Sequence, residues 1–222
     1  MSKSDSQEKD KFPKHLDHLN KTFVEELSYK LWVTKGARFK AHKRLMERNS
    51  LSTSAVAYLT AYLIIFGLIG VYQSVENPFI GLRYIGFGSM AGSILVLIFA
   101  QLESARNYRL EAHLYHTCAL EISELYNEVR IRKTLEITGD VITDQEFCES
   151  IEKRYTDLLK KYPNHSDIDF KLFRVEKKGD YFKDISTFQV VIWKVEYVIQ
   201  NKLIYYLLII LPPLIFMMYW LK

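Results

Sequence analysis

Hydrophobic residues along the chain gather into three windows without charged side chains, separated by segments that are rich in charge. The windows are Leu51–Tyr72, Arg83–Leu102 and Leu203–Lys222, and charged residues lie only at their edges. An α-helix needs about 20 apolar residues to cross the roughly 30 Å hydrocarbon core of a bilayer, so each window predicts a membrane-spanning helix. The alternative, a buried core helix, would show an apolar stripe rather than a wholly apolar surface in so small a domain.

The third window differs from the other two because Pro212 and Pro213 interrupt it. Proline lacks a backbone donor, but a membrane helix tolerates this loss where a neighbouring helix or side chain satisfies the freed carbonyl. Aromatic residues near both ends of the window are typical of membrane–water interfaces: Tyr205, Tyr206, Tyr219 and Trp220. We therefore expect the third window to span the membrane as well.

The first two windows are expected to form an antiparallel hairpin with both outer ends in the cytoplasm. Only a short link, with Asn77-Pro78 as a turn signal, separates them. Seven lysines and arginines lie from Lys30 to Arg48, against the single acid Glu47. Because loops rich in lysine and arginine stay in the cytoplasm, the N-terminus is predicted to be cytoplasmic and the third window to run outward.

Apolar residues at helical spacing continue the first two windows into the charged segments. The spacing of three and four residues indicates helices with one packed seam. The seams comprise Val24, Leu27, Leu31, Ala41 and Leu45 before the first window, and Tyr108, Ala112, Tyr115, Ala119, Ile122, Tyr126 and Val129 after the second. Asn49-Ser50 is the only possible break in the first helix. We expect no break in the second helix until Gly139-Asp140 ends it.

Two further helices are predicted before the third window. Thr143 and Glu146 form a capping-box pattern, and Pro163 ends the helix that they begin. The polar stretch 163–171 is expected to be a turn in which Asp167 and Asp169 make local hydrogen bonds. A third seam is then predicted to run straight into the third window, through Ile185, Phe188, Ile192, Val195 and Ile199.

These elements predict an all-α membrane protein, with a transmembrane hairpin and a third, C-terminal transmembrane helix that are continuous with a cytosolic helical bundle. The expected organisation has five parts along the chain. They are a disordered polar N-terminus at 1–20, a basic juxtamembrane helix at 21–50, the transmembrane hairpin at 51–102, a cytosolic helical domain at 103–202 and a C-terminal transmembrane helix at 203–222.

Composition and motifs give no indication of enzymatic chemistry. The net charge of +4 is too small to indicate nucleic-acid binding, and Cys118 and Cys148 lack the spacing of a disulfide framework or a zinc site. No nucleotide-binding loop, nucleophile elbow or zinc-protease motif is present. His113 and His116 lie one helical turn apart, but we expect surface or packed histidines rather than metal ligands. The chain is predicted to be no enzyme and to hold no cofactor.

Three sets of residues could carry function in or beside the membrane. Small residues at four-residue spacing let helix backbones approach closely, either within the hairpin or between copies in an oligomer; they are Ala57, Ala61, Gly88, Ser89, Gly92 and Ser93. Hydroxyls at the same spacing could line a pore: Ser54, Tyr58 and Tyr62. Basic residues could fix the topology or form a collar that binds lipid headgroups: Lys35, Arg38, Lys40, Lys43, Arg44 and Arg48.

Three stretches of the chain resemble the SLATT family of two-transmembrane effector proteins of bacterial conflict systems. The stretches are "LWVTKGARFKAHKRLMERNSLST", "RNYRLEAHLYHTCALEISELYNEVR" and "RYTDLLKKYPNHSDIDF", and the likeness covers roughly Lys21 to Phe170. The third window resembles the variants that add a C-terminal membrane helix. These motifs carry no catalytic residues.

The resemblance implies an effector that assembles in the bacterial inner membrane and permeabilises it when an upstream sensor acts during phage infection. In related systems the trigger is a nucleotide second messenger or a partner protein such as a nucleotidyltransferase or a reverse transcriptase. Membrane lipid and further copies of the chain are the expected partners. The alternative is a non-toxic membrane scaffold that anchors a soluble partner through its cytosolic helices.

Overall fold

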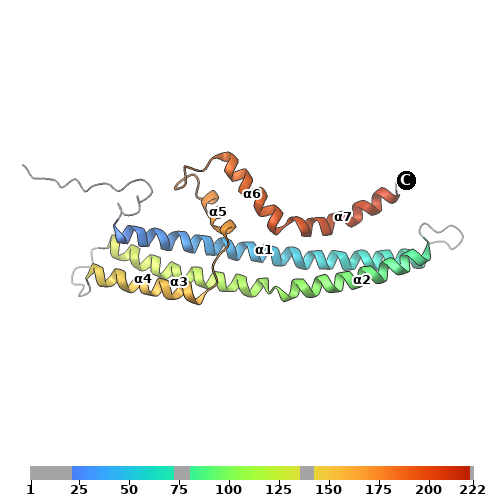
Figure 1. Cartoon of the computed structure of the whole chain (residues 1–222), viewed down its shortest axis with the longest axis horizontal. Helices are drawn as coiled ribbons and strands as arrows, with labels where there is room; N and C mark the ends of the chain where they lie inside the picture. Colours follow the sequence, from blue (N-terminus) through green and yellow to red (C-terminus); the bar gives the residue numbers. More distant parts are fainter. Residues whose placement is uncertain (1–21, 73–80, 136–142, 221–222) are drawn as a thin grey trace, which may run out of the picture.

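The computed structural model describes residues 22–72, 81–135 and 143–220, and every regular element in these ranges is an α-helix (Figure 1). The helices are α1 (Phe23–Tyr72), α2 (Leu82–Ala105), α3 (Tyr108–Thr134), α4 (Asp144–Lys161), α5 (Asp167–Glu176), α6 (Thr187–Asn201) and α7 (Leu203–Trp220). The all-α prediction is confirmed. The expected disordered segment 1–20, the Asn77-Pro78 turn and the Gly139-Asp140 helix end lie outside the described ranges.

Helix α1 is one uninterrupted rod of 50 residues. At 1.5 Å per residue it is about 75 Å long, more than twice the thickness of the hydrocarbon core. Asn49-Ser50 does not break it, and Thr53 Oγ1 donates a hydrogen bond to the Asn49 carbonyl at 2.9 Å within the continuous helix. The predicted basic helix at 21–50 and the first predicted span are therefore two halves of a single helix.

Helices α2 and α3 follow one another along α1 (Figure 1). One unbroken helix was predicted here, but the structure has a break between Ala105 and Tyr108. Asn107 separates them and adopts the left-handed conformation, with φ 49° and ψ 40°. Asparagine is the non-glycine residue that, with aspartate, tolerates this region best, because its short side chain can bond to the local backbone. Asn107 was therefore the overlooked signal for the break between Ala105 and Tyr108.

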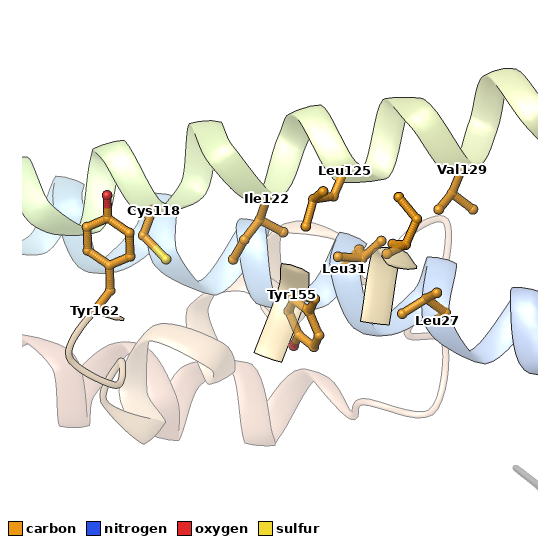
Figure 2. Close-up of a cluster of buried hydrophobic side chains, with 9 residues drawn as sticks. Leu27, Leu31, Cys118, Ile122, Leu125, Val129, Tyr155 and Tyr162 are labelled. Atoms are coloured by element: carbon orange, nitrogen blue, oxygen red, sulfur yellow. The ribbon is translucent and has the colours of Figure 1, made fainter. Parts of the chain in front are cut away.

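The predicted seams of α1 and α3 pack against each other and form the core of the charged part of the protein, next to the apolar windows. This part, the extramembrane bundle, comprises α3 to α6 and the first half of α1. Figure 2 shows side chains of its main cluster, to which α1, α3 and α4 all contribute. The buried cluster consists of Leu27, Leu31, Cys118, Ile122, Leu125, Val129, Ile151, Tyr155 and Tyr162. Both seam predictions are thus confirmed.

The stretch 163–171 is not a turn, because α5 begins inside it at Asp167. Ser166 is the N-cap of α5, and its backbone N–H donates to Asp169 Oδ2 at 3.1 Å, as part of a capping box. The same device starts α4, where the predicted pair Thr143 and Glu146 is confirmed. We missed the pattern in α5 because an aspartate takes the place of the usual glutamate at the third helical position.

The C-terminal helices also differ from the prediction of one straight run. Helices α6 and α7 meet at Lys202 and are bent by 65°. Of the predicted third seam, only Ile185 is buried. The remaining members, Phe188, Ile192, Val195 and Ile199, are 45–74% exposed, so this seam is not part of the core.

Among the described residues, two helical segments are long and apolar enough to span a membrane by themselves: α1, and α2 taken together with α3. A third span follows if α6 and α7 are counted together. Helix α7 has 18 residues, or about 27 Å. Few side chains of the first two apolar windows are buried inside the protein. An apolar surface of this length without protein cover is typical of a membrane protein.

Candidate functional site

Polar side chains from six helices and the α2–α3 link meet at the boundary between the extramembrane bundle and the apolar windows. We call this set the junction network. It lies beside Leu51 and Leu102, where the charge-free windows of α1 and α2 begin. The network consists of Arg44, Glu47, Arg48, Glu103, Arg106, Tyr108, Asp169, Tyr197, Lys202 and Tyr205.

A buried ion pair within the junction network joins α5 to α1. Arg44 Nε donates to Asp169 Oδ1 at 2.7 Å, and Arg44 Nη2 donates to Asp169 Oδ2 at 2.9 Å. The Asp169 side chain is fully buried and that of Arg44 is 11% exposed. Two parallel hydrogen bonds of this kind fix both distance and orientation, which a lysine could not do. Helix α5 is therefore held on α1 in one register.

A second buried arginine holds the link between α4 and α5. Arg38 is 1% exposed and donates to the backbone carbonyl of Pro163. Beside it, Tyr115 on α3 donates to the carbonyl of Asn164 at 2.9 Å. His165 follows in the same link, and burial, aided by the charge of Arg38, lowers the pKa of its imidazole. The hydrogen bonds from Arg38 on α1 and Tyr115 on α3 thus hold this short link against both helices.

Glu47 connects α1 to the elbow between α6 and α7. Its Oε2 atom accepts hydrogen bonds from Tyr197 Oη and lies 2.7 Å from Lys202 Nζ. Burial opposes the charge of Glu47, but the hydrogen bonds from Lys202 and Tyr197 outweigh burial and lower the pKa of the carboxyl. Burial and the bond to Glu47 raise the pKa of the Tyr197 hydroxyl well above its ordinary value. At neutral pH the contact is a carboxylate held by a phenol and an ammonium.

Tyr205 connects α7 to the other helices at the same level. The residue is 1% exposed, and its hydroxyl donates to Glu103 Oε2 at 2.7 Å and accepts from Arg48 Nε at 3.2 Å. The Tyr108 hydroxyl lies 3.4 Å away and accepts from Arg106 Nη1 at 2.9 Å. One phenol therefore contacts α1, α2 and α3 together, so a displacement of any of them must be felt by α7.

The expected lipid collar is corrected for its buried members. Arg38 and Arg44 are not available to headgroups because they are enclosed by protein, and Arg48 bonds to Tyr205. Two lysines also make contacts within the protein: Lys40 pairs with Glu176, and Lys35 lies over the Tyr126 ring at 3.8 Å. Lys43 is exposed. For Lys43, and for the partly exposed Lys35, Lys40 and Arg48, headgroup binding stays a prediction.

The glycines of the predicted packing stripe face the hairpin partner. A Cβ atom at Gly88 would lie 3.0 Å from Phe66 Cε1, and one at Gly92 would lie 2.6 Å from Leu63 Cδ2. Ser93 Oγ donates to the Ser89 carbonyl at 2.7 Å. Of the two open readings, packing within the hairpin is thus the one that Gly88 and Gly92 serve in this structure.

The alanines of the same prediction behave differently. Ala57 and Ala61 lie on the exposed side of α1. Contact with another copy of the chain stays a prediction for these two positions.

The three hydroxyl residues share one side of α1 by their spacing, and the rings of Tyr58 and Tyr62 stack with 6.1 Å between their centroids. Ser54 is half-buried, the Tyr58 ring is 51% exposed, and Tyr62 points to α7, where its hydroxyl donates to the Ile209 carbonyl at 2.8 Å. Pro213 is the residue four positions after Ile209 and has no N–H to offer that carbonyl. Tyr62 therefore supplies the hydrogen bond that the proline removed, and its role in lining a pore is not supported by this contact.

We expect Tyr62→Phe to weaken the attachment of α7 to α1 by about 1 kcal/mol, because the Ile209 carbonyl then lacks a partner in an apolar setting. Faster hydrogen–deuterium exchange in α7, measured in lipid nanodiscs, would show the effect. Tyr58→Phe is the matched control, since the Tyr58 ring is half exposed one turn away. Equal exchange in both variants would contradict the assignment.

Beyond Tyr62 an apolar groove separates the helices of the membrane part. It has a volume of about 680 Å³ and is lined by α1, α2 and α7, including Pro212 and Pro213. Helix α7, which contains both prolines, moves away from α1 towards its C-terminal end (Figure 1). The lining is almost wholly apolar, so the groove suits acyl chains or an apolar helix rather than ions.

The other candidate residues are not assembled into a metal site. His113 is exposed, whereas His116 faces α1, with its ring 4.8 Å from that of His42. Cys118 and Cys148 are buried free thiols, and burial raises the pKa of each. Within the ranges that the structure describes, no three His, Cys, Asp or Glu side chains are close enough to share a metal ion.

Comparison with known proteins agrees with the architecture. Neither the comparison with curated proteins nor the comparison with solved structures found a match. The model of one protein family, SMODS and SLOG-associating 2TM effector domain family 5, matches residues 20–219. The match includes α7 as well as the hairpin and the extramembrane bundle. The resemblance to SLATT proteins is thereby confirmed, and the chain belongs to the SMODS and SLOG-associating 2TM effector domain family 5 (SLATT_5).

Proposed function

We propose that the protein is a membrane effector of bacterial anti-phage defence that oligomerises and opens a pore in, or disrupts, the inner membrane. An upstream sensor or a nucleotide signal would act on its extramembrane helices. The observation that carries this proposal is α1, a single helix of 50 residues that belongs to both the bundle and the membrane part. A continuous helix transmits a displacement over its full length, because bending it requires a proline, a bulge or an inserted group.

The junction network supplies the contacts that would couple the extramembrane bundle to α1 and α7. A signal that shifts α4 or α5 would act on α1 through the Arg44–Asp169 pair. A movement of α1 would in turn reach α7 through the Glu47–Lys202 contact and through Tyr205. Buried, directional contacts favour discrete arrangements rather than gradual deformation, which suits a two-state switch.

The orientation in the proposal follows from charge. Lysines and arginines between Lys30 and Arg48 outnumber acids, so the bundle and the N-terminus lie in the cytoplasm, where a sensor or a nucleotide would be met. We assign no catalytic step, cofactor or metal to the chain. Its partners would be membrane lipid, further copies of itself and the upstream signal.

Self-association would use surfaces that the hairpin leaves open. Gly88 and Gly92 are occupied by the contact with α1, so they are poor candidates for a second interface. Ala57 and Ala61 are exposed at small-residue spacing and would let a helix of another copy approach closely.

The alternative, a non-toxic scaffold, was expected to hold its partner through the heptad seams. The α1 and α3 seams are buried against each other and α4, so of the three predicted seams only the exposed one on α6 is left for such a partner. We therefore favour the effector.

The test is controlled expression in bacteria together with the upstream genes, with a membrane-potential dye and colony counts as readouts. We expect depolarisation and loss of viability on activation. The double variant Ala57→Leu/Ala61→Leu should reach the membrane in equal amount but depolarise cells less, whereas Gly67→Ala on the same helix, where an added Cβ meets nothing within 4 Å, should behave as wild type. Cells that keep their potential and viability under full activation would overturn the effector proposal.

A further inference from the structure

Helix α6 has one face that is anchored to the protein. Val190 and Trp193 pack against the buried cluster of Phe173, Phe182 and Ile185. Further along the same face, Glu196 lies 3.0 Å from Lys171 Nζ on α5, and Tyr197 bonds to Glu47 on α1. These contacts fix both the position of α6 and its rotation about its own axis.

The opposite face of α6 is apolar and uncovered. Its residues recur at spacings of three and four, so they share one side of the helix. The face consists of Phe188, Val191, Ile192, Val195, Val198 and Ile199, which are between 40% and 74% exposed. No charged residue falls within this arc of the described helix, and the exposed Lys194 borders it on one side. An exposed apolar patch of this kind marks a surface for a partner or a membrane.

The geometry of the elbow indicates which partner this is. Helix α6 has 15 residues, a length of about 22 Å, and meets α7 at 65°. If α7 crosses the bilayer, α6 rises only about 9 Å along that direction over its whole length. A rise of this size is close to the depth to which amphipathic helices bury their apolar face in the headgroup layer, so the whole length of α6 fits within that layer.

The level of α6 relative to the bilayer is fixed at its C-terminal end. Tyr197 and Lys202 contact Glu47, which lies four residues before the charge-free window of α1 begins at Leu51. Along the chain, only the three residues Gln200, Asn201 and Lys202 separate the apolar face from the exposed apolar residues of α7 that lipid would cover. A second copy or a soluble protein would have to occupy the same layer against competing lipid.

We propose that α6 is an interfacial helix, with its apolar face inserted in the headgroup layer on the bundle side of the bilayer. The lipid surface then holds one side of α6 while α5 and α1 hold the other. This proposal concerns where α6 lies and does not depend on pore formation.

The test uses the full-length protein in nanodiscs made of phosphatidylethanolamine and phosphatidylglycerol. Val195→Cys on the apolar face and Lys194→Cys beside it carry an environment-sensitive fluorophore; both positions are exposed, and the native thiols Cys118 and Cys148 are buried, with labelled wild type as background. We expect the probe at position 195 to emit at shorter wavelength, to be protected from aqueous iodide several-fold relative to position 194, and to be quenched by lipids with a nitroxide near the headgroup.

Two results would overturn the proposal. One is equal iodide quenching at positions 195 and 194, which would place the apolar face in water. The other is protection at position 195 without nitroxide quenching but with energy transfer between labelled copies, which would assign the face to a second copy of the chain. Because no readout involves toxicity, either result would leave the proposed function standing.

Discussion

Asp169→Ala is expected to lower the free energy of unfolding of the extramembrane bundle by about 3–5 kcal/mol. The aspartate is fully buried, and it makes two hydrogen bonds with its ion-pair partner, the largely buried Arg44. Removing the carboxylate leaves a guanidinium charge in an interior that cannot solvate it. The Ser166 N–H at the start of α5 loses its acceptor at the same time.

The measurement is thermal unfolding in mild detergent followed by circular dichroism, with hydrogen–deuterium exchange to locate the change at α5. Glu176→Ala is the matched control, because it removes the other ion pair between α1 and α5, with Lys40, at a side chain that is 50% exposed. Exposed pairs contribute about 0–1 kcal/mol. The double variant Arg44→Met/Asp169→Leu should recover much of the loss, since two apolar groups need no partner. A loss as small as that of Glu176→Ala would refute the role assigned to the buried pair.

Gly36→Ala is expected to displace α5 from α1 and to cost about 1–3 kcal/mol, the range found for overpacked cores. An added Cβ would lie 2.2 Å from Cε2 of Phe173, which is too close for any van der Waals contact. The ring cannot simply turn away, because Trp32 packs against it at 4.9 Å between ring centroids and Phe182 lies on another side. Glycine in a helix interior is otherwise unfavourable by roughly 0.5–1 kcal/mol relative to alanine, so a close helix contact explains its presence.

Two comparisons separate this effect from the general effect of replacing a glycine. Gly67→Ala lies on the same helix in open space and should be neutral or slightly stabilising. Adding Phe173→Leu to Gly36→Ala should restore part of the stability, because the two residues are in contact and their effects will not add. The assignment fails if Gly36→Ala and Gly67→Ala have the same unfolding midpoint and the same exchange in α5.

Asp169→Ala and Gly36→Ala both act where α5 packs against the first half of α1, within the extramembrane bundle. If the junction network couples the bundle to the spans, both should also change the response of the effector without changing its amount in the membrane. The Glu176→Ala control should leave the response unaltered.

Much of the fold could be predicted because it depends on patterns within a few residues. The spacing of Leu27 and Leu31 on α1, and of Ile122 and Val129 on α3, identified the faces that pack, since a helix repeats every 3.6 residues. The Thr143 capping box located the start of α4 for a similarly local reason. The break at Asn107 and the capping box at Ser166 were also local signals, and we overlooked them.

The site could not be predicted, because its members come from distant parts of the chain. Arg44 and Asp169 are separated by 125 positions, and Tyr62 and Ile209 by 147. A basic residue in a polar stretch looks the same whether it faces lipid, water or a buried carboxylate. Arg38 and Arg44 were therefore assigned to a lipid collar although protein encloses both.

Residue patterns alone indicate that this protein is helical, that its charge-free windows suit a bilayer and which faces of α1 and α3 are packed, because hydrophobic burial follows the period of the helix. Which charges pair, the 65° bend between α6 and α7 and the hydrogen bond from Tyr62 to Ile209 become visible only in the folded chain. The physical reason is that an ion pair or a borrowed hydrogen bond depends on two groups meeting in space, and no periodicity records that meeting.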